Sequence, residues 1–260
     1  MYDTDSPAPS RRGAIDYRTI FNERGEAYHR AMLAYPHARR AEFETIVRLA
    51  APCPGQVLCD APSGGGYLRR YLPDTIGELI SLETSEAFHR LGERSSGGRS
   101  LLTRLEAIDL PAASVDCVVS LAGLHHLPDR SSFFREAARI LRPGGSFCVA
   151  DVAAGTRVAR FLNEFVDRCN SSGHAGVFLG DDAPLEVGAA GFRIDTHCCL
   201  DYAWSFDDAR AMVRFVTMLF GLDRARPDEV RAGIGDYLGY DDTAQGCRMH
   251  WGLRFLRGVR

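Results

Sequence analysis

Short apolar runs alternate with amphipathic stretches between residues 57 and 152. The apolar runs are Val57–Cys59, Leu79–Leu82, Arg99–Arg104, Val115–Ser120 and Ser146–Val152. The stretches with helical spacing between them are Tyr67–Leu72, Ser85–Leu91 and Ser131–Leu141. Strands that alternate with helices at this pitch form a parallel sheet with helices on both faces. The pattern therefore predicts an α/β fold.

Helical stretches flank this alternating region on both sides. Residues 1–14 are mostly polar and are expected to form a flexible tail, and two amphipathic stretches follow within residues 15–52. After residue 152 the pattern predicts helices at Thr156–Cys169, Pro184–Ala190 and Phe206–Gly221 and strands at Phe192–Leu200 and Cys247–Phe255. We expect a single domain over residues 15–260, with a helical insertion at residues 203–245.

Composition excludes several kinds of chemistry. All 31 basic residues are arginine, and a chain without lysine forms no pyridoxal-phosphate Schiff base and has no P-loop lysine. The net charge of −3 and the lack of a basic tract argue against nucleic acid as a partner. The eight cysteines form no C-x-x-C pair, so no metal is expected. Because no signal peptide or membrane-spanning apolar run is present, we expect a cytoplasmic location and no membrane partner.

A glycine-rich loop follows the first predicted strand. The strand ends in Asp60, and the sequence Ala-Pro-Ser-Gly-Gly-Gly leads from there into the next helical stretch. Glycines let the backbone approach a ligand closely, and open α/β sheets bind nucleotides at this edge. The dinucleotide fingerprint fails, because its third glycine would fall on Arg69. The loop therefore predicts a nucleotide-like ligand other than a dinucleotide.

The loop resembles the D-x-G-x-G-x-G motif of class I S-adenosylmethionine (SAM)-dependent methyltransferases of the type 11 group. Asp60, Gly64 and Gly66 match the motif, and Pro62 replaces its first glycine. Glu83 ends the second predicted strand, 83 − 60 = 23 residues after Asp60. An acid at that place can accept hydrogen bonds from both ribose hydroxyls.

Further segments resemble the same family in the same order. Leu105–Pro111 resembles its "GDAEDLP" segment, Leu124–Asp129 its "LHHLPD" segment, and Ile140–Gly145 its "VLKPGG" segment. Ser114–Ser120 resembles the fourth strand of the family. The matches together cover residues 57–152.

The resemblance implies a Rossmann-like, seven-stranded, mostly parallel sheet with helices on both faces and an antiparallel last strand, which Cys247–Phe255 fits. It implies SAM as the cofactor and S-adenosyl-L-homocysteine as its product. The residues it assigns to the cofactor are Asp60, Ala61, Pro62, Ser63, Gly64 and Gly66 on the methionine part, Glu83 and Thr84 near the ribose, Glu106 and the Ala107 amide on the adenine, Ser120 and Leu121 near the sulfonium, and Tyr28 in an N-terminal lid.

The acceptor side is less defined by the sequence. His125 is the candidate catalytic base, because the carboxyl end of the fourth strand lies beside the transferred methyl group in this family. Related enzymes use N-terminal helices as a lid, and the insertion before the last strand favours a small-molecule acceptor with an oxygen, nitrogen or carbon nucleophile, for example in secondary metabolism. The alternative is a SAM-binding protein of this fold that transfers no methyl group and acts as a cyclase or scaffold. A homodimer stays open.

Overall fold

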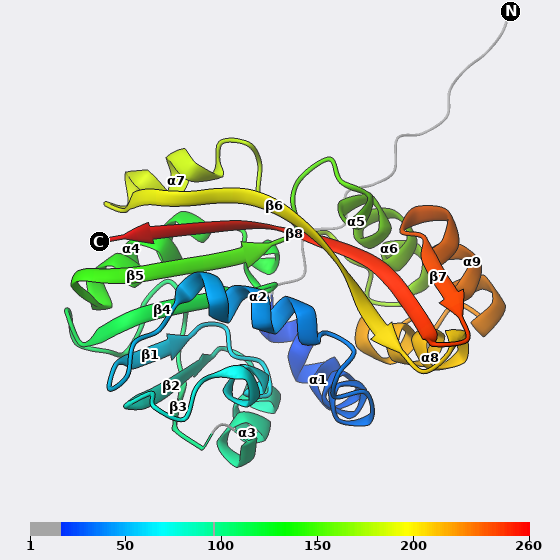
Figure 1. The fold of residues 1–260 in the computed structure, drawn as a ribbon, viewed down its shortest axis with the longest axis horizontal. Coiled ribbons are helices and arrows are strands. Elements are labelled where there is room, and N and C mark those ends of the chain that lie inside the picture. The colour runs from blue at the N-terminus through cyan, green and yellow to red at the C-terminus, as the bar shows by residue number, and fades with distance from the viewer. Residues whose placement is uncertain (1–16, 96) are drawn as a thin grey trace, which may run out of the picture.

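The computed structural model describes residues 17–95 and 97–260, so the predicted tail at residues 1–14 lies outside the described part. One mixed sheet runs through these residues (Figure 1). Its parallel strands are β1 (Val57–Asp60), β2 (Glu78–Glu83), β3 (Arg99–Leu102), β4 (Val115–Leu121) and β5 (Leu141–Asp151). The strand order is β3-β2-β1-β4-β5-β8-β6, in which β8 (Gly246–Val259) and β6 (Arg193–Phe206) are antiparallel to their neighbours.

This topology confirms the predicted α/β fold with an antiparallel last strand. The described residues add an eighth strand, β7 (Tyr240–Thr243), which pairs only with β8. Strand β6 is also longer than predicted. The alternation of inward and outward residues continues past Leu200 through Trp204 to Phe206, and this part of the strand pairs with the start of β8.

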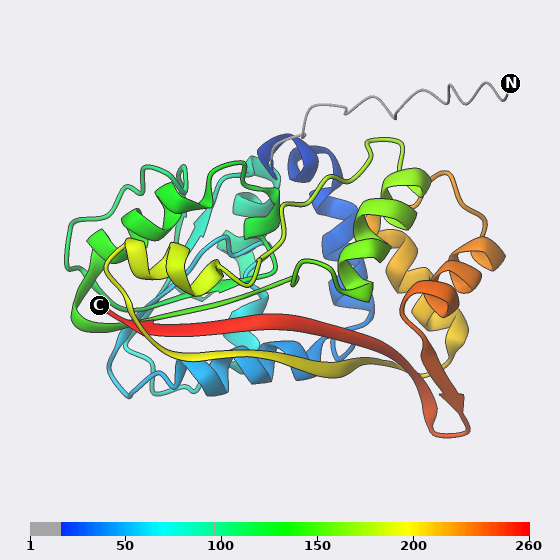
Figure 2. The same ribbon diagram turned by 90° about the horizontal axis from the view of Figure 1, so that it is seen from above.

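Neighbouring residues of each central strand face opposite sides of the sheet, because side chains along a strand alternate with a period of two residues. Leu58 and Val119 belong to one apolar cluster, whereas Cys59 and Val118 belong to the other. The first cluster includes α2 (Arg40–Ala50), and the second includes α4 (Arg130–Ile140) and α7 (Ala183–Ala189). Figure 2 shows α2 on one side of the sheet and α4 and α7 on the other. Helices therefore cover both faces, as predicted.

The helices near the cofactor edge are α1 (Tyr17–Ala34), η1 (Tyr67–Tyr71), α3 (Glu86–Ser95) and η2 (Leu124–His126). Helix η1 is a 3-10 helix where the sequence predicts an ordinary helix. Its start is set by Gly66, whose φ of +76° is outside the helical region. Helices α1 and α3 pack together through a contact between Gly25 and the side chains of Ala87 and Phe88.

A second group of helices surrounds the far ends of β6 and β8 (Figure 1). It consists of α5 (Arg157–Arg160), the π-helix η3 (Phe161–Val166), α6 (Asp167–Cys169), α8 (Ala209–Phe220) and α9 (Pro227–Tyr237). The helices of the predicted insertion thus span residues 209–237, and its outer parts belong to β6 and β7. None of the described helices is long and apolar enough to cross a membrane.

Candidate functional site

The backbone conformation of the glycine loop requires glycine at only some of its positions. Gly64 and Gly66 have φ values of +56° and +76°, in the left-handed region that disfavours side chains with a Cβ. Asp60, at the start of the loop, is buried, and its burial together with the nearby Glu83 raises the pKa of its carboxyl well above the ordinary value. The two glycines that match the motif are therefore the two that the backbone needs.

Pro62 has a definite packing role. The Ala61–Pro62 peptide bond is cis, and the proline ring lies against Gly123, in the segment that follows β4. A Cβ placed on Gly123 would lie 2.4 Å from Cγ of Pro62. The residue that departs from the motif therefore joins the glycine loop to the end of the fourth strand.

Glu83 is fully buried at the end of β2, and four donors surround its carboxylate. Oε1 accepts the amides of Thr84 at 2.7 Å and Ser85 at 2.9 Å, and Oε2 accepts the Gly64 amide at 2.8 Å and the Tyr17 hydroxyl at 3.0 Å. Burial raises the pKa of Glu83 to about 7, although these hydrogen bonds act in the opposite direction. The three amides hold the carboxylate in place, and Tyr17 occupies the position open to a ligand hydroxyl.

Two cavities meet at Tyr17. The first has a volume of about 60 Å³ and is called the methionine pocket, and the second has about 470 Å³ and is called the adenine pocket; both names refer to the part of the cofactor that the sequence predicts there. The predicted residues that line the methionine pocket are Asp60, Pro62, Ser63, Gly64, Leu121 and Tyr28. The predicted residues that line the adenine pocket are Thr84 and Glu106. Because Tyr17 lines both cavities and hydrogen bonds to Glu83, helix α1 divides one elongated site into two.

Five predicted cofactor residues lie outside these linings: Ala61, Gly66, Glu83, Ala107 and Ser120. The expectation for Ala107 does not match the structure, because its amide donates to the Arg104 carbonyl at 3.2 Å and is not free for an adenine ring. Ser120 is fully buried, and its hydroxyl has no partner among the described residues. The Ala61 amide donates a hydrogen bond to the Val119 carbonyl, which fixes the loop to β4.

A third cavity, called the histidine cavity, lies beyond the end of β4 and has a volume of about 60 Å³. It is lined by Phe21, Arg24, Tyr28, Arg39, Ala122, His125, His126, Val152, Leu162, His174, Trp204, Leu219, Phe220 and Trp251. Four of these residues, Phe21, Tyr28, Arg39 and Ala122, also line the methionine pocket. The two cavities are therefore neighbours that share one wall.

His125 is held rigidly at this cavity by Asp151, which ends β5. Nδ1 of His125 lies 2.6 Å from Oδ1 of Asp151, and the His125 amide donates to Oδ2 at 3.0 Å. The carboxylate is fully buried and also accepts the Val152 amide. A carboxylate only accepts, so Nδ1 of His125 carries a proton, and Nε2 is the nitrogen that can accept one in the neutral ring. Asp151 was not among the predicted site residues, although an acid at the carboxyl end of the strand beside β4 was a usable signal.

The opposite wall of the histidine cavity contains a buried ionic group. Arg39 donates to Glu42 and to the Tyr28 hydroxyl, and Nε1 of Trp204 donates to Oε2 of Glu42 at 2.9 Å. Trp204 stacks on Trp251 with ring centroids 4.2 Å apart. The charge of Arg39 is thus matched within the protein, and Tyr28 is fixed where the two cavities meet.

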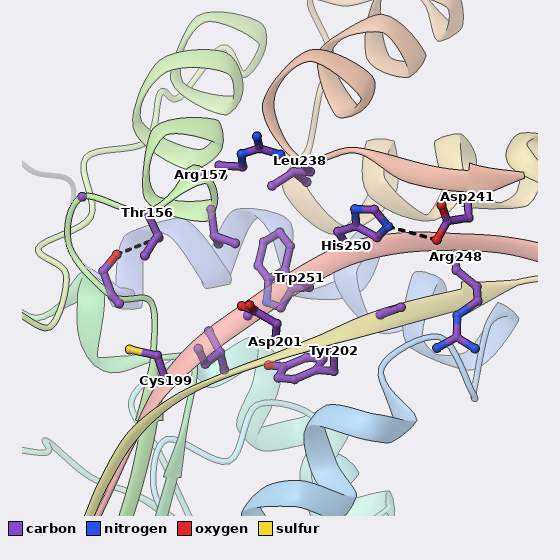
Figure 3. A pocket seen from close by; sticks show the side chains of 16 residues that line it. Thr156, Arg157, Cys199, Asp201, Tyr202, Leu238, Asp241, Arg248, His250 and Trp251 are labelled. Atoms are coloured by element: carbon purple, nitrogen blue, oxygen red, sulfur yellow. Dashed lines mark hydrogen bonds and ion pairs between the residues drawn. The ribbon is translucent and has the colours of Figure 1, made fainter.

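A fourth, larger cavity lies against the hairpin of β6 and β8 (Figure 3). This hairpin groove has a volume of about 820 Å³ and is lined by Asp201, Tyr202, Arg157, His250 and Trp251 among others. Trp251 also lines the histidine cavity, and its Nε1 has no partner among the described residues. Among the described residues only Trp251 lines both spaces, so it lies between the groove and the histidine cavity.

Residues 59–149 match the family model described as "Methyltransferase domain". A "Probable S-adenosylmethionine-dependent methyltransferase" from Mycolicibacterium smegmatis is 32% identical over 158 residues, which is 58% of this chain and 55% of that protein. The chain thus spans about half the length of this curated relative.

Two solved structures have a similar fold. The geranyl diphosphate C-methyltransferase of Streptomyces coelicolor A3(2), solved with S-adenosyl-L-homocysteine, has a TM-score of 0.58 and 12% identity, and the match covers 90% of this chain and 83% of that chain. The [4+2]-cyclase SpnF has a TM-score of 0.53 and 19% identity, and the match covers 83% and 78%. At these identities the likeness shows the fold alone.

Proposed function

Because the chain belongs to the class I SAM-dependent methyltransferases, we propose that it transfers the methyl group of SAM to a small-molecule acceptor. The methionine part of SAM lies along the loop from Asp60 to Gly64, the ribose at Glu83, and the adenine in the pocket beside Glu106. The backbone at Ser120 and Leu121 faces the sulfonium. Tyr17 must leave Glu83 before the ribose hydroxyls can bind there.

The shared wall between the methionine pocket and the histidine cavity is the observation that carries this proposal. Ala122 borders both spaces directly after β4. A sulfonium bound beside Leu121 would therefore direct its methyl group towards the histidine cavity. This arrangement brings the acceptor next to the transferred group, which is the main requirement of a methyl transfer.

We further propose that His125 removes the acceptor's proton. The acceptor lone pair forms a bond to the methyl carbon while the bond from sulfur to that carbon breaks. The products are the methylated acceptor and S-adenosyl-L-homocysteine, and the proton moves to Nε2 of His125. Asp151 is a positioning residue, because it orients the ring and stabilises the charge that the ring acquires. The lining of aromatic side chains favours an acceptor with a flat apolar body.

The test combines turnover with binding. Labelled SAM is incubated with an extract of small molecules, and products are examined for one added methyl group and for S-adenosyl-L-homocysteine. Asp151→Asn should lower turnover by about 100-fold or more, since general-base catalysis contributes about that much, and should leave SAM affinity unchanged. Asp195→Asn is the matched control, because Asp195 pairs with Arg257 away from the four cavities.

Two results would contradict this proposal. SAM binding without methylated product across many acceptors would favour the cyclase or scaffold alternative. Equal turnover of the two aspartate variants would exclude the role of His125. A cytoplasmic location, a part in secondary metabolism and independence of nucleic acids belong to the same proposal and rest on composition and motifs alone.

A further inference from the structure

Three histidines converge at the histidine cavity from two distant segments of the chain. His125 and His126 come from η2 after β4, and His174 comes from the loop after α6. One ring nitrogen from each lies within 4.8 Å of the other two. We call these three residues the histidine cluster. The ring centroid of His174 lies 5.6 Å from the ring centroid of His125 and 5.2 Å from that of His126, so the side chains contact one another directly.

Hydrogen bonds set the tautomers of two cluster members. Nδ1 of His125 donates to Asp151, as described above. Nδ1 of His174 lies 2.9 Å from Oδ1 of Asn163. The amide of Asn163 cannot be reversed, because Oδ1 also accepts the Gly176 amide at 2.8 Å and Nδ2 donates to the Gly176 carbonyl at 2.9 Å. Both Nδ1 atoms therefore carry protons, and Nε2 is the nitrogen that has the lone pair in the neutral form of each ring.

We propose that His125, His126 and His174 bind one divalent transition-metal ion, with zinc as the best match. Three imidazoles with one open position form a known type of catalytic zinc site. Ligating histidines characteristically donate their other N–H to a carboxylate or a carbonyl oxygen, as His125 and His174 do here. The proposal rests on the proposed function, since it names how the acceptor of that reaction is held.

The fit requires only small side-chain rotations. Ligand nitrogens at about 2.1 Å from a tetrahedral zinc ion lie about 3.4 Å apart, so the nitrogens would approach one another by at most about 1.4 Å. Neutral imidazoles are the form that binds metals. Asn163 lies in the π-helix, whose wider turn is a frequent feature of functional sites.

The charges around the cavity indicate the class of acceptor. Arg24 reaches the Leu219 carbonyl through Nη2 at 3.0 Å, and its Nε has no partner among the described residues. Arg39 is matched by Glu42, Asp223 acts on Arg24, and Asp151 supplies one further negative charge. A divalent ion beside Arg24 would therefore leave an excess of positive charge. Such a site favours an acidic hydroxyl, that is a phenol or an enol, which becomes an anion when it coordinates the metal.

The metal changes the role of His125 in the proposed reaction. Its Nε2 lone pair is then used for coordination, so the metal acidifies the acceptor hydroxyl in place of direct proton removal. The hydroxyl proton passes to water, the oxygen forms its bond to the methyl carbon, and the bond from sulfur to that carbon breaks. The products are the methyl ether, S-adenosyl-L-homocysteine and one proton, with no oxidant or reductant required.

Metal binding can be measured without any acceptor. Protein freed of metal by a chelator is titrated with Co²⁺, monitored by visible absorption, and then with Zn²⁺, monitored by calorimetry. We expect one equivalent of either ion. His174→Ala should weaken binding by about 100-fold or more, and Asn163→Ala by about 10- to 100-fold, because it removes the partner of His174 Nδ1 but no metal ligand. His197→Ala is the matched control, since His197 lies exposed on β6.

The outcomes separate this inference from the proposed function. Absence of binding, or equal binding by the His174 and His197 variants, would overturn the metal site. Methylation of a phenol that is equally fast after removal of the metal would also overturn it and would leave the proposed function intact. Stoichiometric, His174-dependent binding in a protein that methylates no acceptor would support the site and contradict the proposed function.

Discussion

The hydrogen bond from Tyr17 to Glu83 should compete with the cofactor. In the free protein the Tyr17 hydroxyl lies 3.0 Å from Oε2 of Glu83, while the other donors to this carboxylate are backbone amides. A ribose hydroxyl can take the place of the tyrosine hydroxyl, whereas it cannot replace the amides. Tyr17→Phe removes the competitor and keeps the ring that packs against Phe21. We therefore expect tighter binding of SAM.

The magnitude follows from the type of hydrogen bond that is broken. A hydrogen bond to a charged group contributes about 1.5–3 kcal/mol to the state that contains it. Removing it from the free state alone lowers the free energy of binding by that amount. Since 1.4 kcal/mol corresponds to a factor of ten, the affinity for SAM should rise by about 10- to 100-fold.

Calorimetric titration with SAM at pH 8, where Glu83 is mostly ionised, measures this effect. Tyr71→Phe is the matched control, because its hydroxyl donates to the Pro36 carbonyl and not to Glu83. An unchanged or weaker affinity of the Tyr17 variant would refute the reasoning. It would mean that Tyr17 keeps an equivalent hydrogen bond when the cofactor is bound.

Two further predictions concern the same end of the sheet. SAM affinity should fall about tenfold per pH unit below pH 7, because burial raises the pKa of Glu83 to about 7 and only the ionised carboxylate accepts a ribose hydroxyl at the place that Tyr17 leaves. The pKa of the nearby Asp60 is raised as well. Calorimetry between about pH 5.5 and 8.5 checks this, and a flat profile would show that Glu83 stays ionised. Gly123→Ala should destabilise the fold by about 1–3 kcal/mol in a denaturant titration, because its Cβ would meet Pro62. Gly188→Ala, which has open space in α7, should not destabilise it, and equal effects of the two variants would contradict the packing role of Pro62.

The sequence was most informative where local rules decide the structure. The central strands follow from short apolar runs, and the need for Gly64 and Gly66 follows from a tight turn with positive φ. The cap of α3 is equally local, since the Ser85 hydroxyl accepts the Phe88 amide at the start of the helix. These features depend on residues only a few positions apart, so pattern and spacing suffice.

The contacts that define the acceptor side could not be predicted in the same way. The hydrogen-bonded residues Asp151 and His125 are 26 positions apart in the sequence, and Tyr17 and Glu83 are 66 positions apart. His174 has no histidine near it in the sequence, and no local pattern shows that its loop folds back to η2. The motif placed Ala107 at the adenine, but the turn at Arg104 uses its amide. Tertiary packing decides each of these cases.

The order of the strands has a consequence for how the protein is assembled. Strand β6 has β8 as its sole described neighbour in the sheet, and β8 in turn pairs with β5 through Ser146–Asp151. During synthesis, β6 therefore has no partner strand until Gly246–Val259 has emerged from the ribosome. The alternating apolar side chains of β6 are exposed to other chains for that time. Contacts of high sequence separation form slowly. Aggregation of newly made protein should thus begin at β6. Adding a charged residue to the outer face of β6 should reduce this aggregation.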